Sequence, residues 1–356
     1  MKIGILTFHC AYNYGAVLQC YALQSYIKSL GIDVEIINYR PSYLVCRKPK
    51  FDFLEFVLSI KENHSISYLG KFVTRLRKYD KFRKFESDFM RLTEICHAEE
   101  DIIQISKRFS HIIIGSDQVW CKKFNGDESI WFGKGIPSIK LIFYAVSAGN
   151  TNIDYIDNYR NQIERSVHIS VREKELQDAL SKLQILSTCV LDPTLMVPHN
   201  IWQPFFTQNK YGRYVLVRQA RPDEKIYYVA TRLANTLNCK VITADVHDNS
   251  FNYASKVIAC SPYEFISLVR NAFCVITNSF HGLAVSIITE SNFYVVEEND
   301  GLDERSRNLL AQLLLDDRMI ENGHIPTFRE IDYSFVNKRL ESLRFESQQF
   351  LINSIS

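Results

Sequence analysis

The chain has 356 residues, of which 46% are apolar and 23% charged, so a collagenous, low-complexity or largely disordered protein is excluded. The 42 Lys and Arg residues against 40 Asp and Glu residues give a net charge of +2, which does not indicate a nucleic-acid-binding protein. The nine cysteines show no C-x-x-C spacing and no adjacent pair of histidines, so we expect no disulfide framework and no metal site. At about 150 residues per domain, the length favours two domains.

The N-terminal residues are typical of a strand and not of a signal peptide, because no charged segment precedes a long apolar stretch. No uncharged stretch reaches the ~18 residues that a membrane-spanning helix needs. We therefore expect a protein of the reducing cytoplasm.

Short apolar runs alternate with helical stretches along the first half of the chain, as in parallel strands joined by crossover helices. Residues 2–8, 15–30 and 34–39 are predicted as strand, helix and strand, which together form one βαβ unit. Further strands are predicted at 111–115, 140–146, 168–171 and 189–192.

The second half repeats this alternation. Strands are predicted at 213–217, 240–243, 274–277 and 293–296. Helices are predicted at 224–237, 262–271 and 282–290. Ser261 and Glu264 form the pattern of a capping box, with proline at the first helical position. A proline cluster between residues 193 and 208 marks a linker, so we predict an N-terminal domain over 1–197, a C-terminal domain over 198–329 and a final segment over 330–356.

Residues from about 50 to 92 do not continue the alternation, and we interpret them as a helical insertion in the first domain. Within it, residues 71–91 carry eight basic residues against three acidic ones. Apolar residues recur there at steps of three and four, which is typical of a helix with one buried face. Two interpretations stay open for the charges: an ordinary solvated face, or a surface for anionic lipid or another polyanion.

Polar residues join the strand 274–277 to the following helix. Asn278 and Ser279 can cap the helix, which begins near His281 and Gly282. Free backbone N–H groups and the helix dipole favour a phosphate or carboxylate there, and Gly282 lets a ligand approach the backbone. His281 then either exchanges a proton with the ligand or only packs at the helix start.

Arg172 directly follows a predicted strand. Its guanidinium can bind a carboxylate or phosphate through two N–H groups, or it can pair with Glu173 or Glu175. Asp117 and Gln118 follow another strand in the same way. Asp117 either accepts a proton from a hydroxyl group or caps the next turn.

The end of the first strand carries side chains suited to sugar recognition, since aromatic rings cover the C–H face of a sugar and amides bind its hydroxyls. The alternative is a turn held by an asparagine and a glycine. The predicted acceptor-binding residues of this segment are His9, Tyr12, Asn13, Tyr14 and Gly15.

Two arginines follow the last predicted strand of the second domain. Arg305 and Arg307 come after the strand 293–296 and open a helix. They either add positive charge to the cleft between the domains or are surface residues.

Several familiar motifs are absent from the sequence. There is no G-x-x-x-x-G-K-[ST] phosphate loop and no G-x-G-x-x-G after the first strand, so a Walker NTPase and a standard dinucleotide enzyme are disfavoured. No D-x-D aspartate pair ends a strand, as would be needed to hold a metal and a nucleotide diphosphate.

Taken together, the sequence resembles the polysaccharide pyruvyl transferase family over roughly residues 2–320. Members of that family attach pyruvate to a sugar as a ketal, with phosphoenolpyruvate as donor. The resemblance implies two Rossmann-like α/β domains facing a cleft, as in GT-B glycosyltransferases, with a last helix, about residues 330–352, crossing back to the first domain. The motifs that carry the resemblance are Asn13-Tyr14-Gly15-Ala16, Gly115-Ser116-Asp117-Gln118-Val119-Trp120, Ala145-Val146-Ser147-Ala148-Gly149, Ser170-Val171-Arg172-Glu173, Asp192-Pro193-Thr194 and Asn278-Ser279-Phe280-His281-Gly282.

By this resemblance Arg172 and His281 match the residues that bind the donor, and Phe280 flanks the histidine. Many members carry Arg-Leu-His-Gly where this chain has Ser-Phe-His-Gly, so an arginine beside the histidine is missing. Either Arg305 or Arg307 is expected to supply that charge.

The expected reaction needs no cofactor and no metal. It transfers a pyruvyl group from phosphoenolpyruvate to a hexose, with galactose and a 4,6-ketal as our first choice, in a capsular or exopolysaccharide precursor linked to polyprenyl diphosphate. His281 and Arg172 would act on the donor, Asp117 would be the base, and the protein would work at the inner face of the membrane. Two alternatives stay open: a GT-B glycosyltransferase that uses a nucleotide sugar, and a non-catalytic sugar- or phosphate-binding protein.

Overall fold

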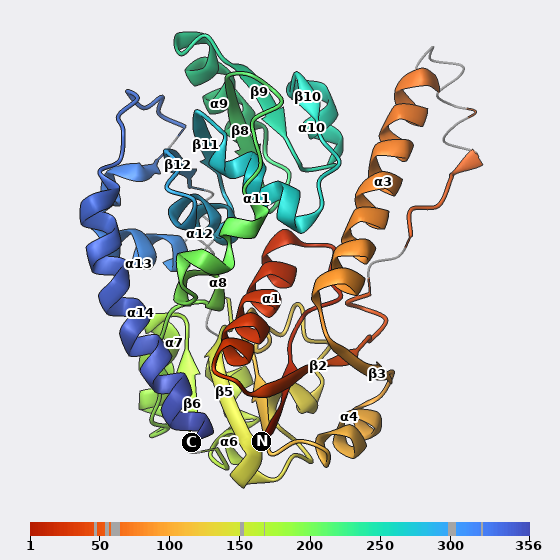
Figure 1. Ribbon diagram of the computed structural model, residues 1–356, viewed down its shortest axis with the longest axis vertical. Coiled ribbons are helices and arrows are strands. Elements are labelled where there is room, and N and C mark those ends of the chain that lie inside the picture. The colour runs from red at the N-terminus through yellow and green to blue at the C-terminus, as the bar shows by residue number, and fades with distance from the viewer. Residues whose placement is uncertain are drawn as a thin grey trace.

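The protein folds into two α/β domains, each built on a parallel sheet. Figure 1 shows the computed structural model with the C-terminal domain above the N-terminal domain. The first sheet has the strand order β3-β2-β1-β4-β5-β6-β7 and the second has the order β10-β9-β8-β11-β12-β13. This confirms the prediction of two Rossmann-like α/β domains. The structure describes residues 1–45, 48–53, 57, 65–149, 153–166, 168–297, 304–321 and 323–356.

The strands of the first sheet are β1 (Lys2–Leu6), β2 (Asp33–Tyr39), β3 (Leu92–Cys96), β4 (His111–Ile114), β5 (Leu141–Val146), β6 (His168–Val171) and β7 (Thr188–Cys189). The central strands are continuous apolar runs because helices cover both faces of the sheet. The predicted strand at 189–192 is wrong in its extent, because β7 ends at Cys189 and the chain then leaves the sheet.

The helices of this domain are α1 (Tyr14–Ser29), α3 (Ser65–Phe89), α4 (Glu99–Ser106), α5 (Ile153–Asp157), α6 (Arg160–Ile163) and α7 (Lys174–Lys182), with short 3₁₀ turns η1 (Ser129–Phe132) and η2 (Ser138–Lys140). Helix α3 occupies much of the predicted insertion and joins β2 to β3, so it is also a crossover connection of the sheet. Residues 54–56 and 58–64 of the predicted insertion lie outside the described residues.

The second domain contains strands β8 (Tyr214–Arg218), β9 (Lys240–Thr243), β10 (Lys256–Val257), β11 (Cys274–Thr277), β12 (Phe293–Val296) and β13 (Met319–Ile320). Its helices are α9 (Glu224–Thr236), α10 (Asp248–Tyr253), α11 (Pro262–Arg270), α12 (Phe280–Ile288) and α13 (Glu304–Leu313), with the 3₁₀ turn η5 (Asp316–Arg318). The capping box predicted for α11 is confirmed: Ser261 Oγ accepts from Glu264 N at 3.2 Å, and Ser261 N donates to Glu264 Oε2 at 2.8 Å.

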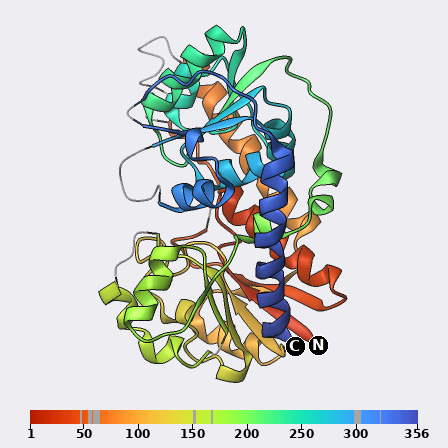
Figure 2. The same cartoon turned by 90° about the vertical axis from the view of Figure 1, so that its left-hand side faces the viewer.

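The chain crosses between the domains twice, side by side. The first crossing contains α8 (Pro193–Met196) and the 3₁₀ turns η3 (His199–Ile201) and η4 (Gln203–Phe205). The second is α14 (Tyr333–Ile355), which runs along both domains in Figure 2. At its start Tyr333 OH donates to Ser291 O of the second domain at 2.6 Å, and further along Ser347 Oγ accepts from Leu191 N at 2.9 Å. The last helix therefore crosses back, as the resemblance implies.

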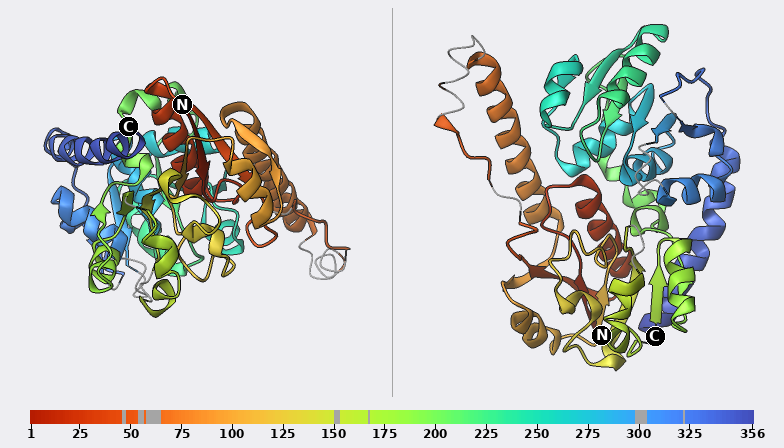
Figure 3. Two further views of the ribbon diagram at one scale, coloured as in Figure 1. Left: turned by 90° about the horizontal axis from the view of Figure 1, so that it is seen from below. Right: turned by 180° about the vertical axis from the view of Figure 1, so that it is seen from behind.

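Helix α3 connects the domains on the opposite edge, where it rises beside the second domain in Figure 3. Lys81 Nζ lies 2.7 Å from Glu264 of α11, and Arg75 Nη2 lies 2.7 Å from Asp248 of α10. Six of the eight basic residues of the 71–91 segment have an acidic partner within 4.0 Å. The residues paired in this way are Lys71, Arg75, Lys81, Arg83, Lys84 and Arg91.

The two longest helices, α3 and α14, carry many charged side chains. Across the described ranges, none of the helices combines the length and apolar character needed to cross a bilayer.

Candidate active site

A cavity of about 340 Å³ lies between the two domains, at the carboxyl ends of their central strands. The first domain contributes Asn13, Asp117 and Gln118 to its lining. The second domain contributes Asn278, Ser279, Phe280, His281 and Arg305. The cavity thus brings together predicted donor-side and acceptor-side residues from distant parts of the chain.

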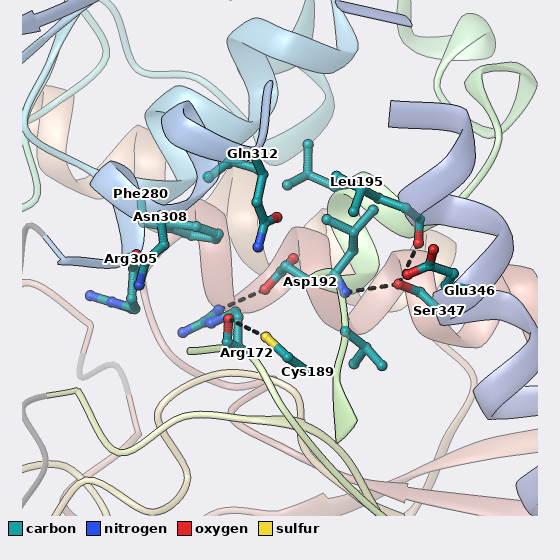
Figure 4. Close-up of a pocket in the computed structure, with 14 residues that line it drawn as sticks. Arg172, Cys189, Asp192, Leu195, Phe280, Arg305, Asn308, Gln312, Glu346 and Ser347 are labelled. Carbon is teal, nitrogen blue, oxygen red and sulfur yellow. Dashed lines mark hydrogen bonds and ion pairs between the residues drawn. The ribbon is translucent and has the colours of Figure 1, made fainter. Parts of the chain in front are cut away.

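A second cavity of about 240 Å³ lies behind the first and is drawn in Figure 4. It is bounded by α13, α14 and the end of β7. Phe280 and Arg305 line both cavities, so they form part of the wall between them. Arg172 and Asp192 lie at this wall, on the side of the second cavity.

Helix α12 begins at the cavity because Ser279 caps it. Ser279 Oγ accepts from Gly282 N at 3.3 Å. The helix dipole and the first N–H groups of α12 therefore favour an anion at this point. Gly282 has a role that was not predicted: a β-carbon there would lie 2.2 Å from Thr277 Oγ1, so this glycine permits close packing of the helix on the strand.

Asn278 lines the cavity, but its amide group holds the neighbouring loop. Its Oδ1 accepts from Ala220 N at 2.7 Å, and its Nδ2 donates to Arg221 O at 3.3 Å. Asn278 therefore positions the β8–α9 loop, and it also lines the cavity in which it is predicted to bind the donor.

Arg172 is buried at the end of β6, with its side chain 2% exposed. Its Nη1 donates to Asp192 Oδ2 at 2.6 Å, and its Nη2 lies 3.7 Å from Asp117 Oδ1. Its Nε and Nη2 make no hydrogen bond within the described residues. Buried guanidinium N–H groups without acceptors are poorly satisfied, so Arg172 has capacity left for an anionic ligand.

Arg305 and Arg172 both approach the ring of Phe280. Their guanidinium carbons lie 5.6 and 4.8 Å from the ring centre, within the range of cation–π attraction. Burial, together with the nearby charge of Arg172, lowers the pKa of Arg305. Arg307 instead pairs with Glu297 and Glu321 away from the cavity. The choice that the sequence left open therefore falls on Arg305.

Two buried carboxylates beside the arginines were not predicted as site residues. Asp192 stands just before Pro193 and accepts from Arg172; its place in the Asp192-Pro193-Thr194 motif was the available signal. Burial opposes its ionisation, but the charges of His281 and Arg172 hold the pKa of the Asp192 carboxyl well below its ordinary range. Glu173 follows Arg172 and accepts from Ser147 Oγ.

Glu173 lies behind the pair of arginines. Its Oε1 is 3.8 Å from Arg172 Nε and 3.9 Å from Arg305 Nε. Burial raises the pKa of the Glu173 carboxyl, although the two arginines oppose this. One carboxyl group therefore contacts both guanidinium groups and keeps them close together.

His281 lies at the first turn of α12, where the two domains touch. Its Nε2 is 3.4 Å from Asp192 Oδ2. On the other side, a β-carbon built on Gly15 would lie 2.1 Å from His281 Nδ1. Only a glycine fits at position 15, so Gly15 serves the contact between α1 and the histidine. Gly15 was predicted to bind the acceptor, but it is not among the residues that line the cavity.

Three further predictions for the first loop are corrected by the structure. His9 is buried, with its Nε2 3.2 Å from Asn38 Oδ1. Tyr12 packs against Phe82 of α3. Tyr14 OH donates at 3.2 Å to the carbonyls of residues 244 and 260 in the second domain. None of the three is among the residues that line the cavity.

The remaining acceptor-side predictions do line the cavity. Asn13 caps α1 by accepting from Gly15 N at 2.8 Å, and Gln118 has a buried Nε2 with no partner within the described residues. Asp117 has a φ of 73°, a left-handed conformation that aspartate tolerates. Lys123 and Phe124 complete this side of the cavity, and nothing in their sequence pattern indicated it.

Three comparisons place this geometry among known proteins. A search of curated protein sequences finds no match. Among solved structures, the chain is similar to the UDP-GlcNAc 2-epimerase of Neisseria meningitidis, with 12% identity, a TM-score of 0.46, and coverage of 98% of this chain and 93% of that chain. It is also similar to the Escherichia coli ADP-heptose LPS heptosyltransferase II, with 10% identity, a TM-score of 0.40, and coverage of 98% and 100%.

The third comparison is with protein-family models. The model described as polysaccharide pyruvyl transferase matches residues 13–300, which include most of the residues that line the cavity. The chain therefore belongs to the polysaccharide pyruvyl transferase family.

Proposed function

We propose that this transferase moves a pyruvyl group from phosphoenolpyruvate to two hydroxyl groups of one hexose. The observation that carries the proposal is the pair of buried arginines at the wall of the cavity. Arg172 and Arg305 keep guanidinium nitrogens without hydrogen-bond partners in the described residues, beside the N-terminus of α12 and His281. This arrangement suits a small ligand that carries both a carboxylate and a phosphate.

The proposed reaction starts with a proton. Protonation of the methylene carbon makes C2 of phosphoenolpyruvate electrophilic, and a sugar hydroxyl adds there as it loses its own proton. A second hydroxyl of the same sugar then displaces the phosphate and closes the ketal, and the proton that this hydroxyl loses leaves with the inorganic phosphate. His281 supplies the proton, and Asp117 accepts the proton of the attacking hydroxyl. Arg172, Arg305 and the α12 N-terminus stabilise the leaving phosphate, and no metal or cofactor takes part.

The proposed acceptor lies on the side of the first domain. Asn13 and Gln118 offer amide groups to hydroxyls, and Phe124 offers an aromatic ring. We propose galactose with a 4,6-ketal, in a capsular or exopolysaccharide precursor linked to polyprenyl diphosphate. Assays with a panel of free and lipid-linked hexoses test this part. Turnover of gluco- but not galacto-configured acceptors would contradict the choice of sugar.

Contact with the inner membrane face is part of the same proposal, since a lipid-linked acceptor resides there. Flotation with neutral and anionic liposomes tests it. Preferential recovery with anionic liposomes supports the contact, and equal recovery with both contradicts it.

Ligand-induced stabilisation tests the donor. Phosphoenolpyruvate should raise the Tm, whereas uridine and guanosine diphosphates should not. The reverse ranking would favour a glycosyltransferase that uses a nucleotide sugar. Stabilisation by phosphoenolpyruvate without release of phosphate in the presence of any acceptor would favour a binding protein.

The two neighbouring arginines of α13 provide a matched pair of variants. Arg305→Lys keeps the charge but loses the planar set of N–H groups, so it should weaken phosphoenolpyruvate binding by roughly 10-fold. Arg307→Lys should change binding by less than about 2-fold, because Arg307 pairs with Glu297 away from the cavity. Equal effects of both substitutions would contradict the assignment of Arg305.

A further inference from the structure

Asp192 stands where the chain leaves the first sheet, and its carboxylate is fully buried. Its Oδ1 accepts from Thr194 N at 2.9 Å and so caps α8. Its Oδ2 accepts from Arg172 Nη1 at 2.6 Å, drawn in Figure 4, and from Ser116 Oγ at 3.2 Å. Three segments of the first domain therefore fix the position of this carboxylate.

The same Oδ2 faces a side chain of the other domain. His281 Nε2 lies 3.4 Å from it, and Nε2 is buried without a hydrogen-bond partner within the described residues. A neutral imidazole carries its proton on only one nitrogen. If Nε2 were bare, its lone pair would face a carboxylate oxygen away from water, which is unfavourable. An N–H at Nε2 would instead be attracted to the carboxylate.

The imidazole has little room to avoid this contact. Gly15 lies against its Nδ1 edge, where even a β-carbon would be 2.1 Å from Nδ1. The ring of Phe280 stands at 87° to the imidazole, with 5.3 Å between ring centres. The imidazole is therefore held between Gly15 of α1 and Asp192, which both belong to the first domain. A flip of the ring that exchanges the positions of Nδ1 and Nε2 is obstructed.

We propose that Asp192 is a positioning residue that keeps a proton on Nε2 of His281 and so fixes the orientation of the imidazole at the start of α12. This inference rests on the proposed function, because His281 is the residue that supplies the proton in the proposed transfer. Asp192 acts through His281 and Arg172 and need not touch either substrate. The pair is completed only when the two domains are together, since each contributes one partner.

The other charged groups near His281 belong to the same cluster. Arg172 comes from the end of β6, Asp117 from the turn after β4, and Arg305 from α13. Asp117 lies 3.7 Å from Arg172 Nη2, and Arg172 is also the residue that donates to Asp192. Asp117→Asn therefore removes one carboxylate charge beside Arg172, as Asp192→Asn does, but leaves the Asp192–His281 pair intact. This makes Asp117→Asn a matched control.

The test is the tautomer of His281, read from the ¹⁵N chemical shifts of the full-length protein labelled at histidine. The His281 signals are assigned by their loss in His281→Gln. We expect Nε2–H in the unliganded wild type and in Asp117→Asn. In Asp192→Asn we expect a shift of population toward Nδ1–H, together with a loss of kcat of roughly 10- to 100-fold. Asn retains an oxygen for the cap on Thr194.

An Nδ1–H tautomer in the wild-type protein would overturn the inference, and this result does not depend on whether any variant folds. So would an unchanged Nε2–H tautomer in folded Asp192→Asn. The spectra are recorded without substrate, so their outcome is separate from the donor test. Failure of phosphoenolpyruvate to stabilise the protein would overturn the proposed function while the tautomer measurement still decides the role of Asp192.

Discussion

Two strand-to-helix turns meet at the centre of this molecule, and they use similar sequences differently. The turn between β11 and α12 presents Ser279, Phe280 and His281 to the cavity. The turn between β1 and α1 sends His9 into its own domain and Tyr14 into the other domain. Both turns join an apolar strand to a helix through polar and aromatic residues, and both were predicted to bind substrate.

The difference lies in what each turn faces. The β1–α1 turn packs largely against the second domain, where Tyr14 stacks on Phe265 with 4.3 Å between ring centres, and of its predicted residues Asn13 alone is among those that line the cavity. The β11–α12 turn keeps its polar groups beside the open cavity. A strand-end motif therefore identifies a position at the cleft, but the packing of the opposite domain decides whether its side chains meet ligand or protein.

The largest effect should come from the turn that faces the cavity. His281→Gln should lower kcat by about 10²-fold or more, the usual scale of general acid–base catalysis, because glutamine cannot exchange the proton. The fold and the stabilisation by phosphoenolpyruvate should remain. Steady-state kinetics with phosphate release, combined with thermal unfolding, checks this. A folded variant with nearly the parental rate would contradict the role of His281.

A substitution at the contact of the two turns should have a similar effect. Gly15→Ala places a β-carbon 2.1 Å from His281 Nδ1, so the imidazole must move. A displacement of about 1 Å can cost roughly 10²-fold in rate, which we expect in kcat. Gly70→Ala in α3 is the control, because no atom lies within 4 Å of its added β-carbon. Equal rates for the two variants would show that Gly15 does not position the histidine.

The β1–α1 turn should affect the pH dependence of stability through its buried side chain His9. Burial lowers the pKa of His9 to about 4, so His9 stays neutral in the folded protein while the unfolded chain takes up a proton below its ordinary pKa of 6.5. Stability should therefore fall as the pH falls, by about 2 kcal/mol from this group between pH 7 and pH 5. Urea unfolding of His9→Gln should show a smaller loss over this range. A loss equal to that of the wild type would exclude a neutral, buried His9.

The smallest effect should come from Tyr14. Tyr14→Phe removes the hydroxyl that donates to two carbonyls of the second domain, which should cost about 1 kcal/mol of stability. Chemical unfolding measures this change, and the KM for the acceptor should stay within about 2-fold. A large rise in acceptor KM with unchanged stability would restore Tyr14 to the acceptor site.

The sequence predicted the fold well where strands are buried on both faces. Strand β3 was missed because it lies at the edge of the sheet and carries Thr93 and Glu94 in its middle. Edge strands lack the continuous apolar run that marks a central strand. The sequence before α3 was also harder to interpret, because it shows no pattern typical of a strand.

Candidate residues that directly follow a strand lie at the cavity walls, as Arg172 does. The choice between Arg305 and Arg307 needed the structure, because residues two apart on a helix point to different sides. Glu173 and Asp192 were missed as site residues because their role depends on partners from distant strands. Such partners become visible only when the sheet order is known.

The two edges of the domain junction differ in the kind of bond that holds them. On one edge the chain itself connects the domains through α8 and α14, and these covalent connections do not depend on the salt concentration. On the other edge α3 holds the second domain partly through Lys81 and Glu264, whose side chains are 40% and 37% exposed. Such pairs are screened as ionic strength rises, with a Debye length of about 10 Å at 0.1 M. Salt therefore acts on the junction asymmetrically: it weakens the ion pairs of the α3 edge and leaves the connections through α8 and α14 unchanged.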